Sequence, residues 1–126
     1  MMRKLIGLFL FAASATASLA LDGPVAGPEI RAAVAGKTVY IQSSMGEIPI
    51  RYNANGTLLG RTELALLDGE STAIDRGRWW VVDNKLCIRW RNWMEAKPYC
   101  FTMHRLGKNT VRWYRNDGES GTARLG

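Results

Sequence analysis

The sequence is poor in the residues that most enzymes and metal proteins use. Its 126 residues include only two cysteines and one histidine. A structural zinc site needs about four ligands, mostly Cys and His, so this chain has no such set. Gly-rich phosphate loops, Gly-x-Ser-x-Gly and His-Glu-x-x-His are also absent. The sequence therefore predicts no metal and no cofactor, and it favours a non-catalytic protein over an enzyme.

The sequence also lacks an apolar run long enough to span a bilayer. Residues 5–13 form a nine-residue apolar run after the basic pair Arg3 and Lys4, whereas a spanning helix needs roughly 20 apolar residues. Small residues at 15–17 and 18–20 match the cleavage pattern of a secretory signal. We therefore expect residues 1–20 to be a cleaved signal peptide, the protein to be periplasmic or secreted, and no transmembrane span.

Two cysteines in an exported chain are typical of a single disulfide. Cys87 and Cys100 are separated by twelve residues, which does not match the Cys-x-x-Cys spacing of a redox pair. In the chain-entropy model, closing a loop of this length adds about 3 kcal/mol to the free energy of unfolding. We therefore predict a structural disulfide between Cys87 and Cys100.

Turn dipeptides divide most of the chain into short β-rich runs. Residues 28–35 predict one short helix that ends at Gly36. Beyond it, runs rich in Val, Ile, Tyr, Trp and Thr lie between Asn-Gly, Asp-Gly and Asp-Asn turns. We predict a linker and helix at 21–36, and a single mainly β domain at 37–126, an antiparallel meander that forms a small barrel or a curved sheet. The expected strands are 37–42, 47–53, 57–67, 77–82, 85–91, 98–104, 110–115 and 119–125.

The predicted disulfide also sets a register for the central hairpin. With Cys87 opposite Cys100, alternation places the apolar side chains of both strands on one face, and the arginines and cysteines on the other. One face is then core, and the other is basic and carries the disulfide. The remaining expected pairs are Leu86–Phe101, Ile88–Tyr99, Trp90–Lys97 and Asp83–His104.

Charge is divided unevenly along the mature chain. Residues 21–75 hold 4 Lys and Arg against 7 Asp and Glu, a net of −3, whereas residues 76–126 hold 11 against 4, a net of +7. All five tryptophans lie in the second part, where basic residues flank them. Such interleaving can bind nucleic acid, but strand alternation with Trp inside and Arg outside also produces it, and export argues against nucleic acid. We expect either a solvated basic face or one that meets an anionic envelope component, with Arg89, Arg91, His104 and Arg112 as its candidate residues.

Other single residues carry further functional hypotheses. Trp93 and Met94 are expected in the hairpin turn near 92–95, where they either anchor a partner protein or fold back over the barrel mouth. As a general base, His104 would need an orienting carboxylate and a nucleophile, and a single His on a strand is more often structural. The leading hypothesis is a non-catalytic binding module that uses an apolar cavity or the basic face. The alternatives are a protein-interaction module, such as an exported inhibitor or envelope assembly factor, and a hydrolase that uses His104.

The second half of the chain resembles a group of small exported bacterial proteins. The motifs are Gly77-Arg78-Trp79-Trp80-Val81, Leu86-Cys87-Ile88-Arg89-Trp90, Tyr99-Cys100-Phe101 and His104-Arg105, followed by an Asp117-Gly118 turn. In this order, over about residues 76–118, they resemble domain of unknown function 995. The resemblance implies export and a compact, lipocalin-like β fold. It implies no particular activity.

Overall fold

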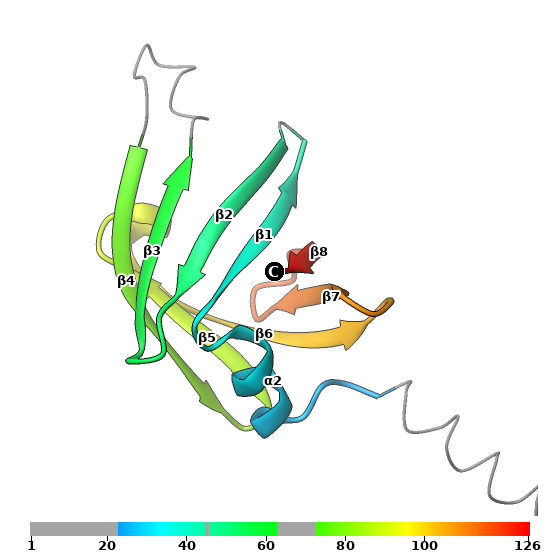
Figure 1. The fold of residues 1–126 in the computed structure, drawn as a ribbon. Coiled ribbons are helices and arrows are strands. Elements are labelled where there is room, and N and C mark those ends of the chain that lie inside the picture. The colour runs from blue at the N-terminus through cyan, green and yellow to red at the C-terminus, as the bar shows by residue number, and fades with distance from the viewer. Residues whose placement is uncertain (1–22, 45, 63–72) are drawn as a thin grey trace, which may run out of the picture.

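Residues 23–44, 46–62 and 73–126 are described in a computed structural model. One helix, α2 (Gly27–Val34), precedes eight antiparallel strands, each paired with the next, and the last strand pairs with the first to close a barrel (Figure 1). The strands are β1 (Lys37–Ser43), β2 (Gly46–Tyr52), β3 (Thr57–Thr62), β4 (Ala73–Val82), β5 (Lys85–Trp90), β6 (Pro98–Arg105), β7 (Thr110–Arg115) and β8 (Ser120–Leu125). The predicted mainly β fold is confirmed, and the closed barrel is the form it takes.

The element bounds follow the sequence pattern closely, with one clear exception. Pro28 lies in the first turn of α2, and Gly36 follows it with φ 75°, as predicted. β4 begins at Ala73, whereas the sequence predicts a start at residue 77. The predicted start is late because Asp75 interrupts the apolar alternation that marks the rest of the strand. The predicted signal peptide at 1–20 and residues 63–67 of the predicted third strand lie outside the described residues.

Helix α2 lies at one end of the barrel, opposite the end that carries the β1–β2 turn (Figure 1). Its residues Ile30 and Val34 are fully buried, one helical turn apart and therefore on one face. At its first residue, the backbone N–H of Gly27 donates to Asn84 Oδ1 at 2.7 Å. These contacts make the helix a plug that closes this end. No helix in the described part of the chain is both long and apolar enough to cross a bilayer.

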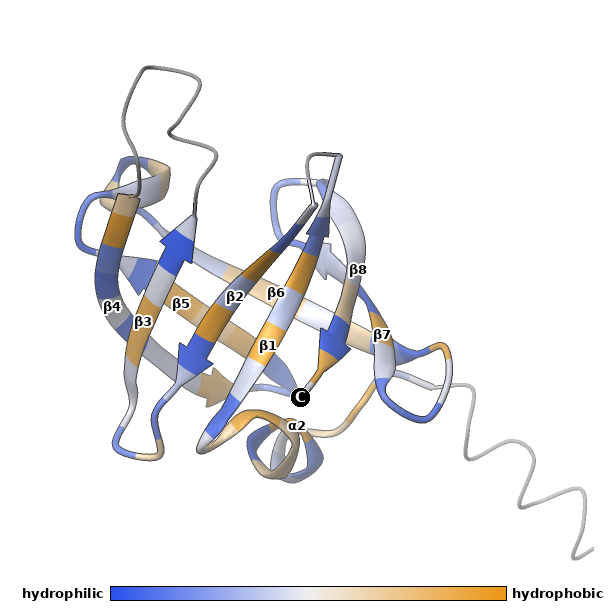
Figure 2. Cartoon of the chain, turned by 45° about the horizontal axis from the view of Figure 1, so that its top comes forward, coloured by the Kyte–Doolittle hydropathy of each residue, from blue (hydrophilic) through white to orange (hydrophobic). Residues whose placement is uncertain are grey.

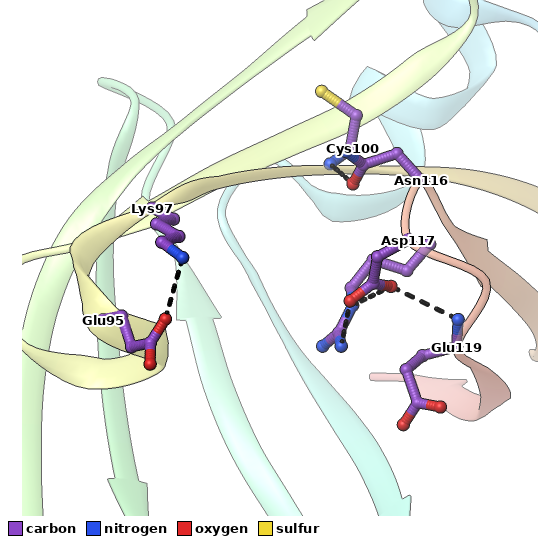
Figure 3. A network of polar contacts seen from close by, with 7 residues as sticks. Glu95, Lys97, Cys100, Asn116, Asp117 and Glu119 are labelled. Carbon is purple, nitrogen blue, oxygen red and sulfur yellow. Dashed lines mark hydrogen bonds and ion pairs between the residues drawn. The ribbon is translucent and has the colours of Figure 1, made fainter.

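Cys87 and Cys100 form the predicted disulfide, with an S–S distance of 2.07 Å. The two cysteines are directly opposite each other, and the pairs Leu86–Phe101 and Ile88–Tyr99 on either side are as predicted. Asn116, in the turn between β7 and β8, contacts the backbone beside the disulfide. Its Oδ1 accepts the backbone N–H of Cys100 at 3.0 Å (Figure 3).

Two pairs of the predicted register are wrong. The β5–β6 ladder runs only from Leu86 to Arg89, so neither Trp90–Lys97 nor Asp83–His104 forms. Beyond one end of the ladder, Arg91 turns toward β4 and donates its N–H to the Arg76 oxygen at 2.8 Å. Beyond the other end, the segment before α2 replaces β5, and Pro24 forms a bridge with His104. His104 therefore has no strand-paired carboxylate.

Most of the tryptophans and arginines on β4 and β5 follow strand alternation. Trp79 and Trp90 are buried and Arg78 and Arg89 are exposed, whereas Trp80 is exposed on the same face as the arginines. Figure 2 shows the same alternation of apolar and polar residues along β1 and β2. The pattern of Trp inside and Arg outside therefore needs no nucleic-acid partner to explain it.

Candidate ligand-binding cavity

The inward-facing side chains line a partly open apolar cavity of about 410 Å³ within the barrel. This volume lies in the range of small-molecule sites, roughly 300–1,000 Å³. The wall is built mainly from aliphatic and aromatic side chains of α2 and most of the strands. Among the described lining residues, side-chain nitrogen or oxygen atoms occur only on Tyr52, Thr62, Trp90, Trp93, Trp113 and Arg115. The cavity is thus suited to an apolar molecule with a small polar part.

Strand β7 supplies a polar end to the cavity. Trp113 and Arg115 are two residues apart and so point to the same face of the strand, and both line the cavity. The Nε1 of Trp113 is buried and has no hydrogen-bond acceptor among the described residues. A buried donor without a partner costs about 1–3 kcal/mol. A Cβ added to Gly121 would lie 3.3 Å from this nitrogen, so the N–H edge of the indole faces the barrel wall and Arg115 supplies the polar group of the cavity.

The Trp113 ring lies against a glycine on the neighbouring strand. Gly121 is directly opposite Trp113 in the β7–β8 ladder, and a Cβ added to Gly121 would come 2.6 Å from Trp113 Cζ2. On its other side the ring meets the edge of Phe101, with ring centroids 5.4 Å apart. Glycine at 121 therefore allows the indole to lie close to the barrel wall.

Arg115 is the only charged residue among the described lining residues. Its Nε and Nη2 donate to the two carboxylate oxygens of Asp117, both at 2.7 Å, and its guanidinium carbon lies 4.6 Å from the centre of the Tyr99 ring. Asp117 also accepts the backbone N–H of Glu119 at 3.2 Å (Figure 3). The hydrogen bonds that Arg115 donates to Asp117 raise the pKa of Arg115. The guanidinium is thus held in place and charged, and Nη1 takes no part in the hydrogen bonds to Asp117.

The sequence leaves two alternatives for Trp93 and Met94, an anchor for a partner protein or a fold-back over the barrel mouth. In the structure both residues line the cavity. They lie in η2 (Trp93–Ala96), the short 3-10 turn between β5 and β6. The Trp93 ring packs on Trp90 at 4.7 Å between centroids. A Cβ added to Gly60 of β3 would come 2.5 Å from Trp93 Cζ3. The loop therefore folds back over the barrel mouth.

A buried aspartate that sequence reasoning missed positions this loop. Asp75 is 4% exposed, and its Oδ2 accepts the backbone N–H groups of Asn92 and Trp93, each at 2.8 Å. Burial by itself would raise the pKa of Asp75, but these hydrogen bonds outweigh it and hold the pKa below its usual value. Strand alternation could have indicated its burial, because Asp75 lies four residues before Trp79 and therefore on the same inward face of the strand.

The same loop contains three consecutive residues in the left-handed region. Met94, Glu95 and Ala96 have φ values of 54°, 60° and 59°. This conformation costs roughly 1–2 kcal/mol for each residue other than glycine. The exposed ion pair between Glu95 and Lys97, at 3.0 Å (Figure 3), offsets little of it. The Asp75 hydrogen bonds and the packing of Trp93 therefore maintain a strained turn at the mouth.

The structure divides the predicted basic face into two groups. Arg89 lies near Pro98 at one end of β6, whereas His104 is six residues further along that strand, roughly 20 Å away. There His104 is directly opposite Arg112 and meets the Tyr114 ring at 5.5 Å. Arg89 and Arg91 instead share a groove with two arginines of β4, Arg76 and Arg78.

No family model, no curated protein and no solved structure matches the chain.

Proposed function

We propose that the protein is a binding module that holds one small apolar or amphipathic ligand inside the barrel. The observation that carries the proposal is an apolar cavity of about 410 Å³ with one charged residue in its lining. Removal of apolar ligand surface from water would supply most of the affinity. The polar end would set the orientation of the ligand, as a few placed polar groups do in such sites.

The ligand end that meets β7 should carry an acceptor, and an anion fits best. Arg115 lines the cavity as a cation that Asp117 holds in place, and its Nη1 takes no part in the hydrogen bonds to Asp117. A guanidinium donates hydrogen bonds and accepts none. Charge-assisted hydrogen bonds are about twice as strong as neutral ones. A straight-chain carboxylate is therefore the simplest probe of the site.

The cavity supports binding better than catalysis or partner capture. The described lining residues include no Ser, Cys, His, Asp or Glu. For the alternative of a protein-interaction module, Trp93 would have to project outward, yet it packs on Trp90 and closely approaches Gly60. The two functions separate in Trp93→Ala, which should alter ligand affinity if Trp93 is a lid and abolish partner capture if it is an anchor.

We also propose that the protein acts in the periplasm or is secreted, as the signal-like residues 1–20 predict. The Cys87–Cys100 disulfide supports this location, because disulfides persist in oxidising compartments. Mass measurement of the exported protein should show a chain that begins near residue 21 and gains a pair of hydrogens on reduction. Free thiols in periplasmic material would contradict the proposal.

A thermal-shift series tests the cavity. Straight-chain carboxylates from hexanoate to hexadecanoate, and the matched alcohols, should raise the melting temperature, with an optimum at a length set by the cavity. At a ligand concentration about 100 times Kd, the expected stabilisation is about 2.7 kcal/mol. Absence of a shift with every carboxylate and alcohol would contradict the proposal.

A cavity-filling variant localises the binding. Ile48 lines the cavity from β2, so Ile48→Trp should block it and abolish the shift. Leu106→Trp is the matched control, because Leu106 is 55% exposed in a loop, and it should bind as the wild type does. Equal binding by both variants would place the ligand elsewhere.

A further inference from the structure

The outer wall of β4 and β5 carries four arginines in two directly opposed pairs. Arg78 is opposite Arg89 in the ladder, and the N–H of Arg91 donates to the Arg76 oxygen at 2.8 Å, which places these two opposite each other. Directly opposed side chains have Cβ atoms about 5 Å apart, and like charges at this distance destabilise a sheet. The pairs thus place four positive charges in a small area at a cost to stability.

In the described part of the chain, none of these four arginines forms an ion pair with a carboxylate. The ion pairs formed there join Lys97, Arg105, Arg115 and Arg124 to acidic residues, and none involves the four arginines. Arg89 donates its Nε to the Ala96 oxygen at 2.8 Å, which leaves its charge uncompensated. Together the four line a broad groove of about 750 Å³ beside Trp80. Such a groove attracts anions.

Large apolar side chains share this face. Ile74, Trp80 and Val82 are 53%, 37% and 45% exposed. They have the same parity as the two arginines of β4, so the outer face of this strand presents Ile, Arg, Arg, Trp and Val in order. Exposed apolar residues gathered on one face indicate a surface that another molecule covers.

We propose that this outer face of β4 and β5 binds the surface of an anionic phospholipid membrane. The guanidinium groups match phosphate oxygens in geometry and charge. Tryptophan favours the headgroup level of a bilayer, where its ring is half in apolar surroundings. A soluble polyanion would account for the arginines but would leave Ile74 and Val82 in water. The site is separate from the cavity, so it stands whether or not the barrel holds a ligand.

Vesicle co-sedimentation tests the charged part of the surface. Full-length mature protein should bind vesicles of equimolar phosphatidylglycerol and phosphatidylcholine, bind phosphatidylcholine alone much more weakly, and dissociate as salt is raised. The double variant Arg78→Gln with Arg89→Gln should weaken binding by roughly 30-fold, since two basic contacts are lost. Its free energy of unfolding should stay close to that of the wild type, because it removes an opposed pair of like charges and also the hydrogen bond from Arg89 to the Ala96 oxygen.

A control of equal charge separates this surface from net charge. Lys108→Gln with Arg112→Gln alters strand β7 and the turn before it, away from β4 and β5, and should bind vesicles nearly as the wild type does. If both double variants lose binding equally, the attraction is general and the proposal is overturned. Binding of dextran sulfate without binding of the anionic vesicles would also overturn it.

A second pair of variants tests the apolar part. Trp80→Ser should weaken vesicle binding severalfold, whereas Tyr114→Ser, which removes an aromatic ring that is 45% exposed on β7, should not. Equal vesicle affinity of the two variants would contradict insertion of Trp80 at the headgroup level.

Discussion

The two ends of the barrel are built by different physical means. At the helix end, Ile30 and Val34 are fully buried, and the closure is apolar packing. At the mouth, closure depends on a buried carboxylate, Asp75, and on a left-handed turn from Met94 to Ala96. Packing of this kind contributes mainly to stability, whereas buried charge and backbone strain concentrate at functional sites. The comparison therefore associates folding stability mainly with the helix end and the proposed ligand site with the mouth.

The largest expected effect is at the helix end. Ile30→Ala should lower the free energy of unfolding by about 2–5 kcal/mol, because it leaves a cavity at a fully buried position. The same change at Ile74, which is 53% exposed, should alter it by at most about 0.5 kcal/mol. Urea denaturation of both variants measures the difference. Equal effects would mean that the helix does not close the barrel by packing.

The disulfide should be next in size and should act on the hairpin that carries the mouth loop. Cys87→Ser with Cys100→Ser should lower the free energy of unfolding by about 3 kcal/mol, since the unfolded chain regains loop freedom. Urea denaturation of the wild type with and without reductant gives an independent value. A wild type that is indifferent to reductant would contradict the role given to the bridge.

Asp75→Asn should lower the free energy of unfolding by about 2 kcal/mol, because an amide has one acceptor oxygen for the three N–H groups that the two carboxylate oxygens accept. The folded-state pKa of Asp75 lies below its ordinary value, which is about 3.9 in an unfolded chain. The stabilisation is therefore fully present above pH ~4 and is lost as pH falls through the folded pKa, where the unfolded chain binds more protons.

Denaturation of the wild type and of Asp75→Asn across this acid range measures how the contribution of Asp75 to the free energy of unfolding depends on pH. Their difference in free energy should shrink as pH falls. Asp83→Asn, at an exposed turn position, is the control and should behave as the wild type does. A difference between wild type and Asp75→Asn that is constant with pH would contradict a charged Asp75.

The smallest expected effect is a gain in stability at the mouth. Ala96→Gly should raise the free energy of unfolding by about 0.5–1 kcal/mol, because glycine tolerates φ 59°. Ala54→Gly, in an exposed turn without positive φ at that position, should leave the free energy unchanged or lower it. Denaturation midpoints of the two variants decide between strain and a general effect of glycine. A loss at position 96 would mean that the turn is not strained.

Most of the fold could be predicted from local patterns. Period-two alternation and turn dipeptides locate the strands, and one covalent link, Cys87 to Cys100, sets the register of the central hairpin. The register fails where the chain leaves that ladder, at Trp90 and at Asp83, because other segments then pair in place of the expected strand. Local patterns do not show where such exchanges occur.

The candidate site was predicted less well because its parts are distant in sequence. The fold-back of Trp93 depends on Asp75 and on Gly60, both in other strands. Arg115 was not singled out, since its place in the cavity follows only from barrel closure. Arg89 and His104 were grouped by face alone, although the length of β6 separates them. Alternation gives the face of a residue but not its position along the barrel axis.

Calorimetry on dodecanoate and dodecanol with the wild type and Arg115→Gln tests the central claim most directly. If the barrel holds a ligand with its polar end at Arg115, the wild type should bind dodecanoate more tightly than dodecanol. Arg115→Gln should weaken dodecanoate binding by about tenfold to a hundredfold, the effect of a lost charge-assisted hydrogen bond, and leave dodecanol binding nearly unchanged. No binding of either compound, or equal loss of both, would contradict the account.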